Sequence, residues 1–391
     1  MKSRILPAIM VIVLISILLT GCWDLKDIDE RATVLAIGID YADIPQPGNF
    51  EGSYMVKVTL QIAISEQMTG GAGQAPPMGE QVVWNISSTG ATMARAIELC
   101  QEKLKYSLFF GHVRILIFGQ KVAQNGVNQF LNYFRNHPMF RRLSYILVSK
   151  GDAADVLKTF PKSATIQAMF LMNMVETAQN TGRMPDIPFM EFVVRLIDKG
   201  IDPVAIMVSS HKDSVVNTGV AVFRGDNMVG SLDLYETWNF IQITENQRGG
   251  IEVVRDVEDE LGRVTIQLTG VNSNVRPIIQ KNGKVKFIID MEVEGRIVSQ
   301  ETQTDYNDPV LFSALEERVE KEYKRELEQM INKVQKQFKA DIFGFGQQLR
   351  AYQNREWKEI NNWRKAFSEG ELDLTIYVDI RRMGMSTFTK K

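Results

Sequence analysis

Two cysteines and three histidines are the side chains of this sequence that could serve as nucleophiles or soft metal ligands. They are Cys22, Cys100, His112, His137 and His211. No two of the histidines have the short spacing that protein metal sites use. No HExxH, CxxC or GxSxG motif accompanies them. The sequence therefore predicts no metal, no cofactor and no recognisable catalytic group, although pairs of carboxylates brought together by the fold stay open.

Three other segments have only part of a ligand-binding pattern. Residues 68–79 are rich in glycine and proline, but no Lys-Ser or Lys-Thr follows them as in a phosphate loop. GFGQQL at 344–349 has two glycines of a dinucleotide loop and lacks the third, which favours a helix break. DVEDE at 256–260 lacks the glycine and final glutamate of a calcium loop and is expected to be a solvated turn. We interpret the protein as a non-enzyme.

Cys22 has a different chemical setting. Lys2 and Arg4 precede an apolar run from Ile5 to Leu19, which is shorter than the roughly 20 residues of a membrane-spanning helix. The run ends in Leu-Thr-Gly-Cys, which resembles the lipobox of bacterial lipoproteins. The thiol of Cys22 is then the atom on which a diacylglyceryl thioether is built. We predict that residues 1–21 are a signal peptide that is removed, and that Cys22 is the lipid attachment site.

Two acyl chains suffice for stable anchoring, so the mature chain is expected on the outer face of a membrane. Cys100 would be its one remaining thiol, which excludes an intramolecular disulfide. Cys100 shares helical spacing with Met93, Ile97 and Leu104 and is expected in the core.

The charge balance excludes some partners. The 45 basic residues become 43 without Lys2 and Arg4, against 47 acidic residues. The sequence lacks the excess of basic residues that would predict nucleic-acid binding. It also lacks a run of Lys and Arg that would predict a patch for lipid headgroups.

Apolar periodicity predicts a mixed α/β (α+β) ectodomain of several domains. Residues 22–200 alternate strands and helices, with strands at 33–41, 54–64, 113–119 and 144–149 and helices at 120–136, 166–180 and 188–198. Residues 201–270 form a β-rich middle block with a hairpin turn at 225–227.

Residues 271–391 are predicted to form a sheet with a long helix across one face. Asp308 and Pro309 begin this helix as N-cap and first-turn residue, and its apolar stripe runs to Ile342, about 45 Å away. Residues 371–381 alternate as a closing strand. Gly344 and Gly346 follow the helix, and we expect backbone conformations there that a β-branched residue resists.

Four stretches, in order, are similar to the Ger(x)C family, the lipoprotein C subunits of nutrient germinant receptors in endospore-forming bacteria. They are residues 21–40 (GCWDLKDIDERATVLAIGID), 107–157, 218–237 (TGVAVFRGDNMVGSLDLYET) and 335–367. The last is the most specific, with Asp341, Gly344, Gly346, Trp357 and Trp363 at the family's positions. Asn136-His137 departs from the family, which has an acidic residue near this point.

The resemblance implies A and B membrane subunits as partners, the spore inner membrane as location, and a non-catalytic role in starting germination. Trp357 is a candidate partner contact, since tryptophan is enriched in binding hot spots. Arg135, Arg141 and Arg142 are candidates for an anion site, with a solvated loop as the plainer interpretation. A lipid-anchored solute-binding protein, with the germinant or another small molecule held between domains, is the alternative. An anchored cell-wall hydrolase is a third class, without visible catalytic groups.

Overall fold

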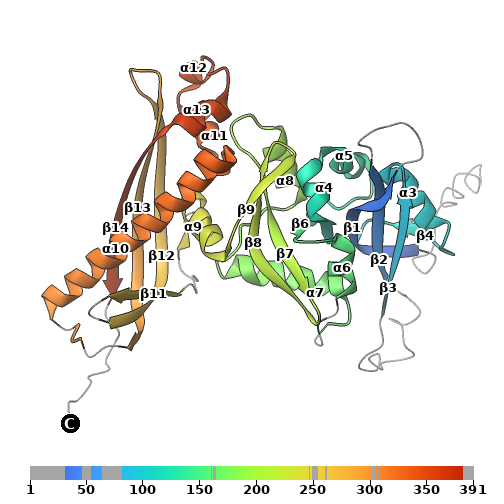
Figure 1. Ribbon diagram of the computed structural model, residues 1–391, viewed down its shortest axis with the longest axis horizontal. Helices are drawn as coiled ribbons and strands as arrows, with labels where there is room; N and C mark the ends of the chain where they lie inside the picture. Colours follow the sequence, from blue (N-terminus) through green and yellow to red (C-terminus); the bar gives the residue numbers. More distant parts are fainter. Residues whose placement is uncertain are drawn as a thin grey trace, which may run out of the picture.

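A computed structural model describes residues 31–45, 54–63, 82–159, 161, 164–245, 247–248, 254–259, 262–301, 304–306 and 308–381 (Figure 1). The predicted signal peptide and Cys22 lie outside these residues. Within the described residues, no helix combines the length and the apolar character that a membrane span requires. Two sheets stand at opposite ends of the molecule, and each is covered by its own helices (Figure 1).

The first sheet has nine strands in the order β3-β2-β1-β5-β6-β7-β8-β9, with β4 paired to β1. Its central strands β1, β5, β6 and β7 run parallel. Strand β5 (Ile115–Phe118) is buried at every position, as a parallel strand covered on both faces should be. The remaining strands are β1 Arg31–Pro45, β2 Tyr54–Ala63, β3 Val83–Gly90, β4 Ser107–Phe109, β6 Tyr145–Ser149, β7 Val204–His211, β8 Ser214–Arg224 and β9 Asn227–Leu232.

Six helices accompany this sheet: α3 Met93–Gln101, α4 Gln120–Asn125, α5 Asn128–Asn136, α6 Ala153–Lys158, α7 Gln167–Asn180 and α8 Phe189–Ile197. The prediction of a single helix over 120–136 is wrong, because the helix is interrupted at Gly126, between α4 and α5. Gly126 has φ of 106°, and a Cβ there would meet Asp226 Oδ2 at 2.9 Å. The break lets Val127 donate its backbone N–H to Asp226 O in the β8–β9 turn.

The second sheet has five strands in the order β10-β12-β13-β14, with β11 paired to β12. They are β10 Gln247–Arg248, β11 Val254–Asp259, β12 Gly262–Ile279, β13 Val285–Glu301 and β14 Glu371–Arg381. Residues 256–259 lie in β11 and pair with β12, so the solvated turn predicted at 256–260 is wrong for these residues. Backbone pairing with a long neighbouring strand outweighs the low strand propensity of the acidic side chains.

Strands from the predicted middle block contribute to both sheets. Strands β7 to β9 belong to the first sheet and β10 to β12 to the second. Helix α9 (Leu234–Thr244) connects them and begins with a capping box of Asp233 and Glu236. The division of the chain into units at residues 200 and 270 stays a prediction.

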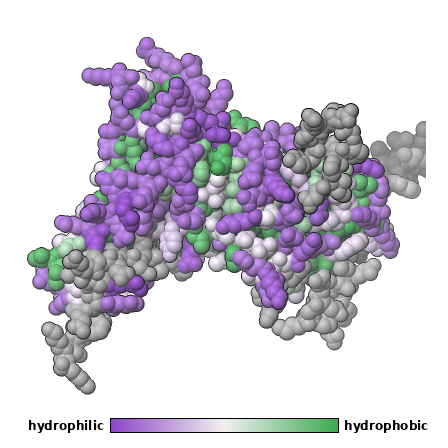
Figure 2. Space-filling view, viewed as in Figure 1, coloured by the Kyte–Doolittle hydropathy of each residue, from purple (hydrophilic) through white to green (hydrophobic). Residues whose placement is uncertain are grey.

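Helix α10 (Pro309–Asn332) lies across one face of the second sheet (Figure 1), and its viewed surface is hydrophilic (Figure 2). Asp308 accepts a hydrogen bond from Val310 N at 2.8 Å, which confirms the predicted cap. A π-helical turn, η3 (Lys333–Phe338), continues α10 until Lys339 reverses the chain with φ of 52°. The helix therefore ends before Ile342. Helices α11 Phe345–Tyr352, α12 Asn354–Trp357 and α13 Trp363–Glu369 follow. The predicted fold class is confirmed.

Candidate functional site

The stretch after η3 folds around the carboxylate of Asp341, which has no exposed surface. This carboxylate accepts hydrogen bonds from the backbone N–H groups that begin α11. They come from Phe343 at 3.1 Å, Gly344 at 3.0 Å, Phe345 at 3.3 Å and Gly346 at 2.8 Å. The indole N–H of Trp363 donates a fifth bond at 2.9 Å. Burial raises the pKa of Asp341 to about 7, although these donors favour the charged form. Asp341 thus satisfies the free N–H groups of a helix start.

The two glycines of this stretch are required for different reasons. Gly344 has φ of 77°, the left-handed conformation expected from the sequence. Gly346 lies inside α11 and has no positive φ, so the prediction of a special backbone conformation is wrong for this residue. A Cβ on Gly346 would lie 2.6 Å from Trp363 Nε1 and 2.7 Å from Gly200 Cα. Close packing, and not conformation, excludes a side chain at Gly346.

A second buried carboxylate, Asp202, lies directly beside the first. Asp202 N donates to Asp341 O at 2.6 Å, and Asp341 N donates to Asp202 Oδ2 at 3.1 Å. Arg364 from α13 pairs with Asp202 through Nη2 at 2.6 Å, and this hydrogen bond raises the pKa of the guanidinium. Gly225 N in the β8–β9 turn also donates to Asp202, at 2.8 Å. One aspartate therefore joins the start of β7, the β8–β9 turn and the C-terminal helices.

Asp198, at the end of α8, completes the arrangement. Arg350 of α11 donates to Asp198 Oδ2 at 2.6 Å, and Gln347 donates to the same oxygen at 3.2 Å. Burial acts to raise the pKa of Asp198, but the bonds from Arg350 and from Gly200 N outweigh it and lower the pKa. We call Asp198, Asp202 and Asp341 with Arg350 and Arg364 the aspartate joint.

The chemistry open to the aspartate joint is structural. Each of its carboxylates already accepts several short hydrogen bonds, so few lone pairs are left for a metal or a substrate. In the part of the chain that the structure describes, no group of three or more His, Cys, Asp or Glu side chains is placed to hold a metal. The joint instead fixes the loop between α8 and β7 to the C-terminal helices, and so holds the two sheets together.

Trp357 packs on this joint. Its ring centroid lies 5.2 Å from that of Trp363, and the Arg350 guanidinium carbon lies 6.0 Å from its ring. The side chain is half-buried, so only one edge is open to a partner. Tyr352 nearby is 84% exposed, although its spacing from Leu349 had placed it on an apolar stripe of the core.

The three candidate arginines lie around the end of α5 and the turn before β6. Arg135 and Arg142 are exposed and Arg141 is half-buried. Arg135 donates to Asn132 Oδ1 at 3.2 Å. With the described residues, none of the three forms an ion pair. Cys100 is fully buried, and burial raises the pKa of its thiol, which suits a core residue.

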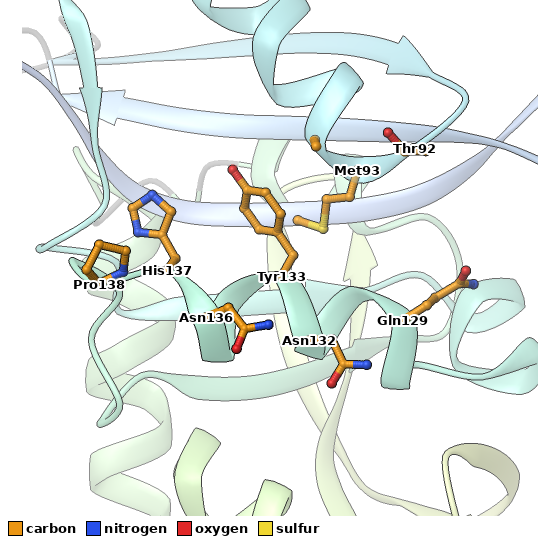
Figure 3. Close-up of a pocket in the computed structure, with 9 residues that line it drawn as sticks. Thr92, Met93, Gln129, Asn132, Tyr133, Asn136, His137 and Pro138 are labelled. Carbon is orange, nitrogen blue, oxygen red and sulfur yellow. The ribbon is translucent and has the colours of Figure 1, made fainter.

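A groove of about 510 Å³ separates the start of α3 from α5 (Figure 3). Tyr133 and Met93 point toward one another across it (Figure 3). Its lining carries amide, hydroxyl and imidazole groups and no carboxylate, lysine or arginine; the residues are Thr92, Met93, Ala94, Gln129, Asn132, Tyr133, Asn136, His137 and Pro138. Burial lowers the pKa of His137, which favours the neutral imidazole. The groove is chemically suited to a neutral ligand that forms hydrogen bonds.

Sequence reasoning missed Asp198, Asp202 and the groove. Asp202 stands before a proline at the start of a buried strand, a weak signal of a turn. The partners of Asp198 and Asp202 are about 150 residues away in the chain, and no local pattern reveals such pairs.

Comparison with known proteins covers the same regions. The family model described as "Spore germination protein N-terminal domain" matches residues 24–210, and "Spore germination B3/ GerAC like, C-terminal" matches residues 218–384. Spore germination protein YndF of Bacillus subtilis (strain 168) is 26% identical, over 98% of this chain and 99% of its own. Spore germination proteins B3 and KC of the same organism are 24% and 23% identical, over 94% and 96% of this chain and 95% of each relative.

Among solved structures, the crystal structure of the GerBC protein shares the fold, with a TM-score of 0.57 and 20% identity. The match covers 89% of this chain and 98% of that chain. Two family models in succession, relatives similar over nearly their full length and a shared fold agree with one another. The chain belongs to the Ger(x)C family of spore germination proteins.

Proposed function

We propose that this chain is the lipid-anchored C subunit of a nutrient germinant receptor and acts without catalysis as a scaffold for the A and B membrane subunits at the spore inner membrane. The observation that carries the proposal is the full-length match to spore germination proteins together with Leu-Thr-Gly-Cys at residues 19–22. The aspartate joint supports the scaffold role, because its buried carboxylates connect separate parts of the structure through ion pairs and hydrogen bonds.

Anchoring contributes to this role through confinement. A chain tethered to a bilayer meets membrane partners at a higher effective concentration without any new contact. The joint adds rigidity, so that surfaces on the two sheets are presented to the partners in one fixed relation. Nutrients then start germination through the assembled receptor.

The test is a pull-down from spore inner membranes with the tagged full chain. We expect the A and B membrane subunits to be recovered with it, and we expect Cys22→Ala to remove the chain from the membrane fraction. Loss of the protein should impair the response to particular nutrients and spare triggers that bypass nutrients. Recovery of neither membrane subunit would overturn the proposal.

The groove between α3 and α5 favours solute binding as a second candidate function, because neutral amides and an aromatic ring suit a small polar nutrient. This groove lies within the first sheet's helices and not between domains. A ligand that binds the native state raises its melting temperature, so a thermal-shift screen of nutrients tests it. Tyr133→Ala should abolish any shift, while Tyr352→Ala should leave the shift unchanged.

A further inference from the structure

Five large apolar side chains are exposed on one surface beside the first sheet. Their exposed fractions are 44% for Met139, 63% for Leu143, 38% for Met190, 39% for Val194 and 63% for Ile197. Met190, Val194 and Ile197 follow one another at four and three residues along α8, so they share one side of this helix. The adjacent side of α8 carries its buried residues, Phe189, Phe192 and Val193. The apolar surface of α8 is therefore wider than the part that the described residues cover.

The turn before β6 continues this surface. Met190 N donates to Arg142 O at 3.3 Å, and Phe189 N donates to Ser144 O at 2.7 Å, so Leu143 stands next to the first turn of α8. Behind them, the rings of Phe140 and Phe189 lie 5.1 Å apart in the core. The apolar side chains thus project from a rigid base. We call them, with Arg135, Arg141 and Arg142, the amphipathic face.

The charge of the amphipathic face is positive. Its three arginines form no ion pair with the described residues. Among the nearby acids, Glu191 pairs with Arg195 at 2.9 Å and Asp198 pairs with Arg350 at 2.6 Å, while Asp186 accepts a hydrogen bond from the Tyr145 hydroxyl at 3.1 Å. Exposed apolar side chains flanked by arginines without an ion pair to the described residues are the composition that binds the boundary between headgroups and acyl chains of an anionic bilayer.

The position of the predicted anchor supports the same occupant. Cys22 lies nine residues before Arg31, so the lipid is at most about 32 Å from the start of β1. Arg114 N donates to Leu35 O and Tyr145 N to Arg114 O, which places the starts of β5 and β6 beside Leu35, four residues after the start of β1. Leu143 and Arg142 stand just before Tyr145. The amphipathic face therefore lies at the sheet edge from which the chain leads back to the anchor.

We propose that the amphipathic face docks on the surface of an anionic bilayer and inserts Leu143, Met190 and Ile197 at the headgroup boundary. The lipid anchor of the proposed function keeps the ectodomain close to the bilayer, while the amphipathic face sets the orientation of the ectodomain on it. The ectodomain then lies on the membrane in one pose, and does not swing freely at the end of its tether. The three arginines that the sequence offered as an anion site then contact lipid headgroups, although no run of basic residues predicted such a patch.

The test uses the lipidated mature chain in vesicles of phosphatidylcholine with or without phosphatidylglycerol. Leu143→Cys and, as the control, Val310→Cys are labelled with an environment-sensitive dye in a Cys100→Ala background. Val310 is 76% exposed and belongs to α10, which lies across the second sheet. We expect a blue shift and quenching by nitroxide-labelled lipids for the dye at 143 in anionic vesicles, and neither effect at 310. Equal behaviour of the two dyes would overturn the proposal.

Arginine variants test the charge. In co-sedimentation of the unlipidated Cys22→Ala chain with anionic vesicles, Arg141→Gln and Arg142→Gln should each weaken binding about fivefold. The exposed Arg355→Gln in α12 should leave binding unchanged. A dye at 143 that is shielded only when the A and B subunits are present would assign the face to protein and contradict the lipid proposal. Fatty-acid labelling of the lipidated chain reports on Cys22 separately, so failure of the anchor and failure of the face are distinguishable.

Discussion

The indole nitrogen of Trp363 lies 2.9 Å from Asp341 Oδ2, in a core where this carboxylate has no contact with solvent. The same ring closes over Gly346, at a distance that leaves no room for a methyl group. Trp363 thus fills space and supplies a hydrogen bond to a buried acid at once. This double role explains why an aspartate, two glycines and a tryptophan occur together in the most specific stretch of the sequence.

Removing the indole donor should destabilise the protein. Trp363→Phe keeps an aromatic ring but deletes one hydrogen bond to a buried acid, and we expect a loss of about 2 kcal/mol in the free energy of unfolding. Urea unfolding measures it. Trp357→Phe is the control, because no hydrogen bond is made by its indole among the described residues, and it should cost less than about 1 kcal/mol. Equal losses in the two variants would contradict this account of Trp363.

Filling the space at Gly346 should also be costly. Gly346→Ala places a Cβ against Trp363 and Gly200 and should cost about 1–3 kcal/mol through overpacking. Gly151→Ala is the matched control, since nothing lies within 4 Å of a Cβ there. Thermal unfolding of both variants checks the prediction, and a Gly346→Ala protein as stable as Gly151→Ala would refute it.

Much of the local structure was predictable from the sequence, because its causes are close together in the chain. Asp308 caps the helix that begins at the next residue, and the alternation in β13 and β14 shows directly as one buried face. The break at Gly126 was not predictable, because its cause is Asp226, a hundred residues away. The cap of α6 also depends on a distant residue. Asp152 occupies the N-cap position, but its side chain makes no capping bond.

Asp40 supplies the missing cap from β1. Its carboxylate accepts hydrogen bonds from Ala153 N at 2.7 Å and Ala154 N at 3.0 Å. Both donors are more than a hundred residues further along the chain, so only the folded structure reveals the contact. The candidate site was predictable in part for the same reason. The sequence identified Asp341 and the glycines, and only the folded structure added Asp198 and Asp202.

The pH dependence of stability should report on Asp40. Burial raises its pKa from 3.8 to about 6, against the lowering effect of the two N–H donors. The folded state therefore binds a proton more tightly than the unfolded state, and stability falls as pH rises from about 4 to above 6, by about 3 kcal/mol. We expect Asp40→Asn to remove about 3 kcal/mol of the pH dependence, while the part due to Asp341, whose pKa burial raises to about 7, remains.

Urea unfolding at a series of pH values measures the slope. Asp155→Asn is the control, because this side chain is exposed and its 4.0 Å pair with Lys158 lies at the surface. A slope in Asp40→Asn equal to that of the parent protein would assign this proton to another group.

Two aromatic positions, the half-buried Trp357 and the exposed Tyr352, separate folding from partner binding. Trp357→Ala removes a ring that packs on Trp363 and should lower the free energy of unfolding by about 1–3 kcal/mol. Tyr352→Ala should change it by less than about 0.5 kcal/mol, because its side chain is 84% exposed. In pull-downs from detergent extracts, lower recovery of the membrane subunits with Tyr352→Ala would identify a contact surface. Lower recovery with Trp357→Ala alone would reflect loss of structure.

Lipidation should depend on one thiol. Cys22→Ala should abolish labelling by a tagged palmitate, while Cys100→Ala should leave the label intact, because Cys100 is fully buried. Gel fluorescence of the labelled cells distinguishes the two. Label retained in Cys22→Ala would refute the assignment of the lipid site.

Helix α8 ends at Ile197, and the next residue, Asp198, holds Arg350 of the C-terminal helices. A force that tilts this helix therefore meets no flexible linker at its C-terminal end. It passes through the pairs of Asp198 with Arg350 and of Asp202 with Arg364 into the part of the molecule that carries the second sheet. The orientation of α8 is thus transmitted through the α8–β7 loop to the C-terminal helices.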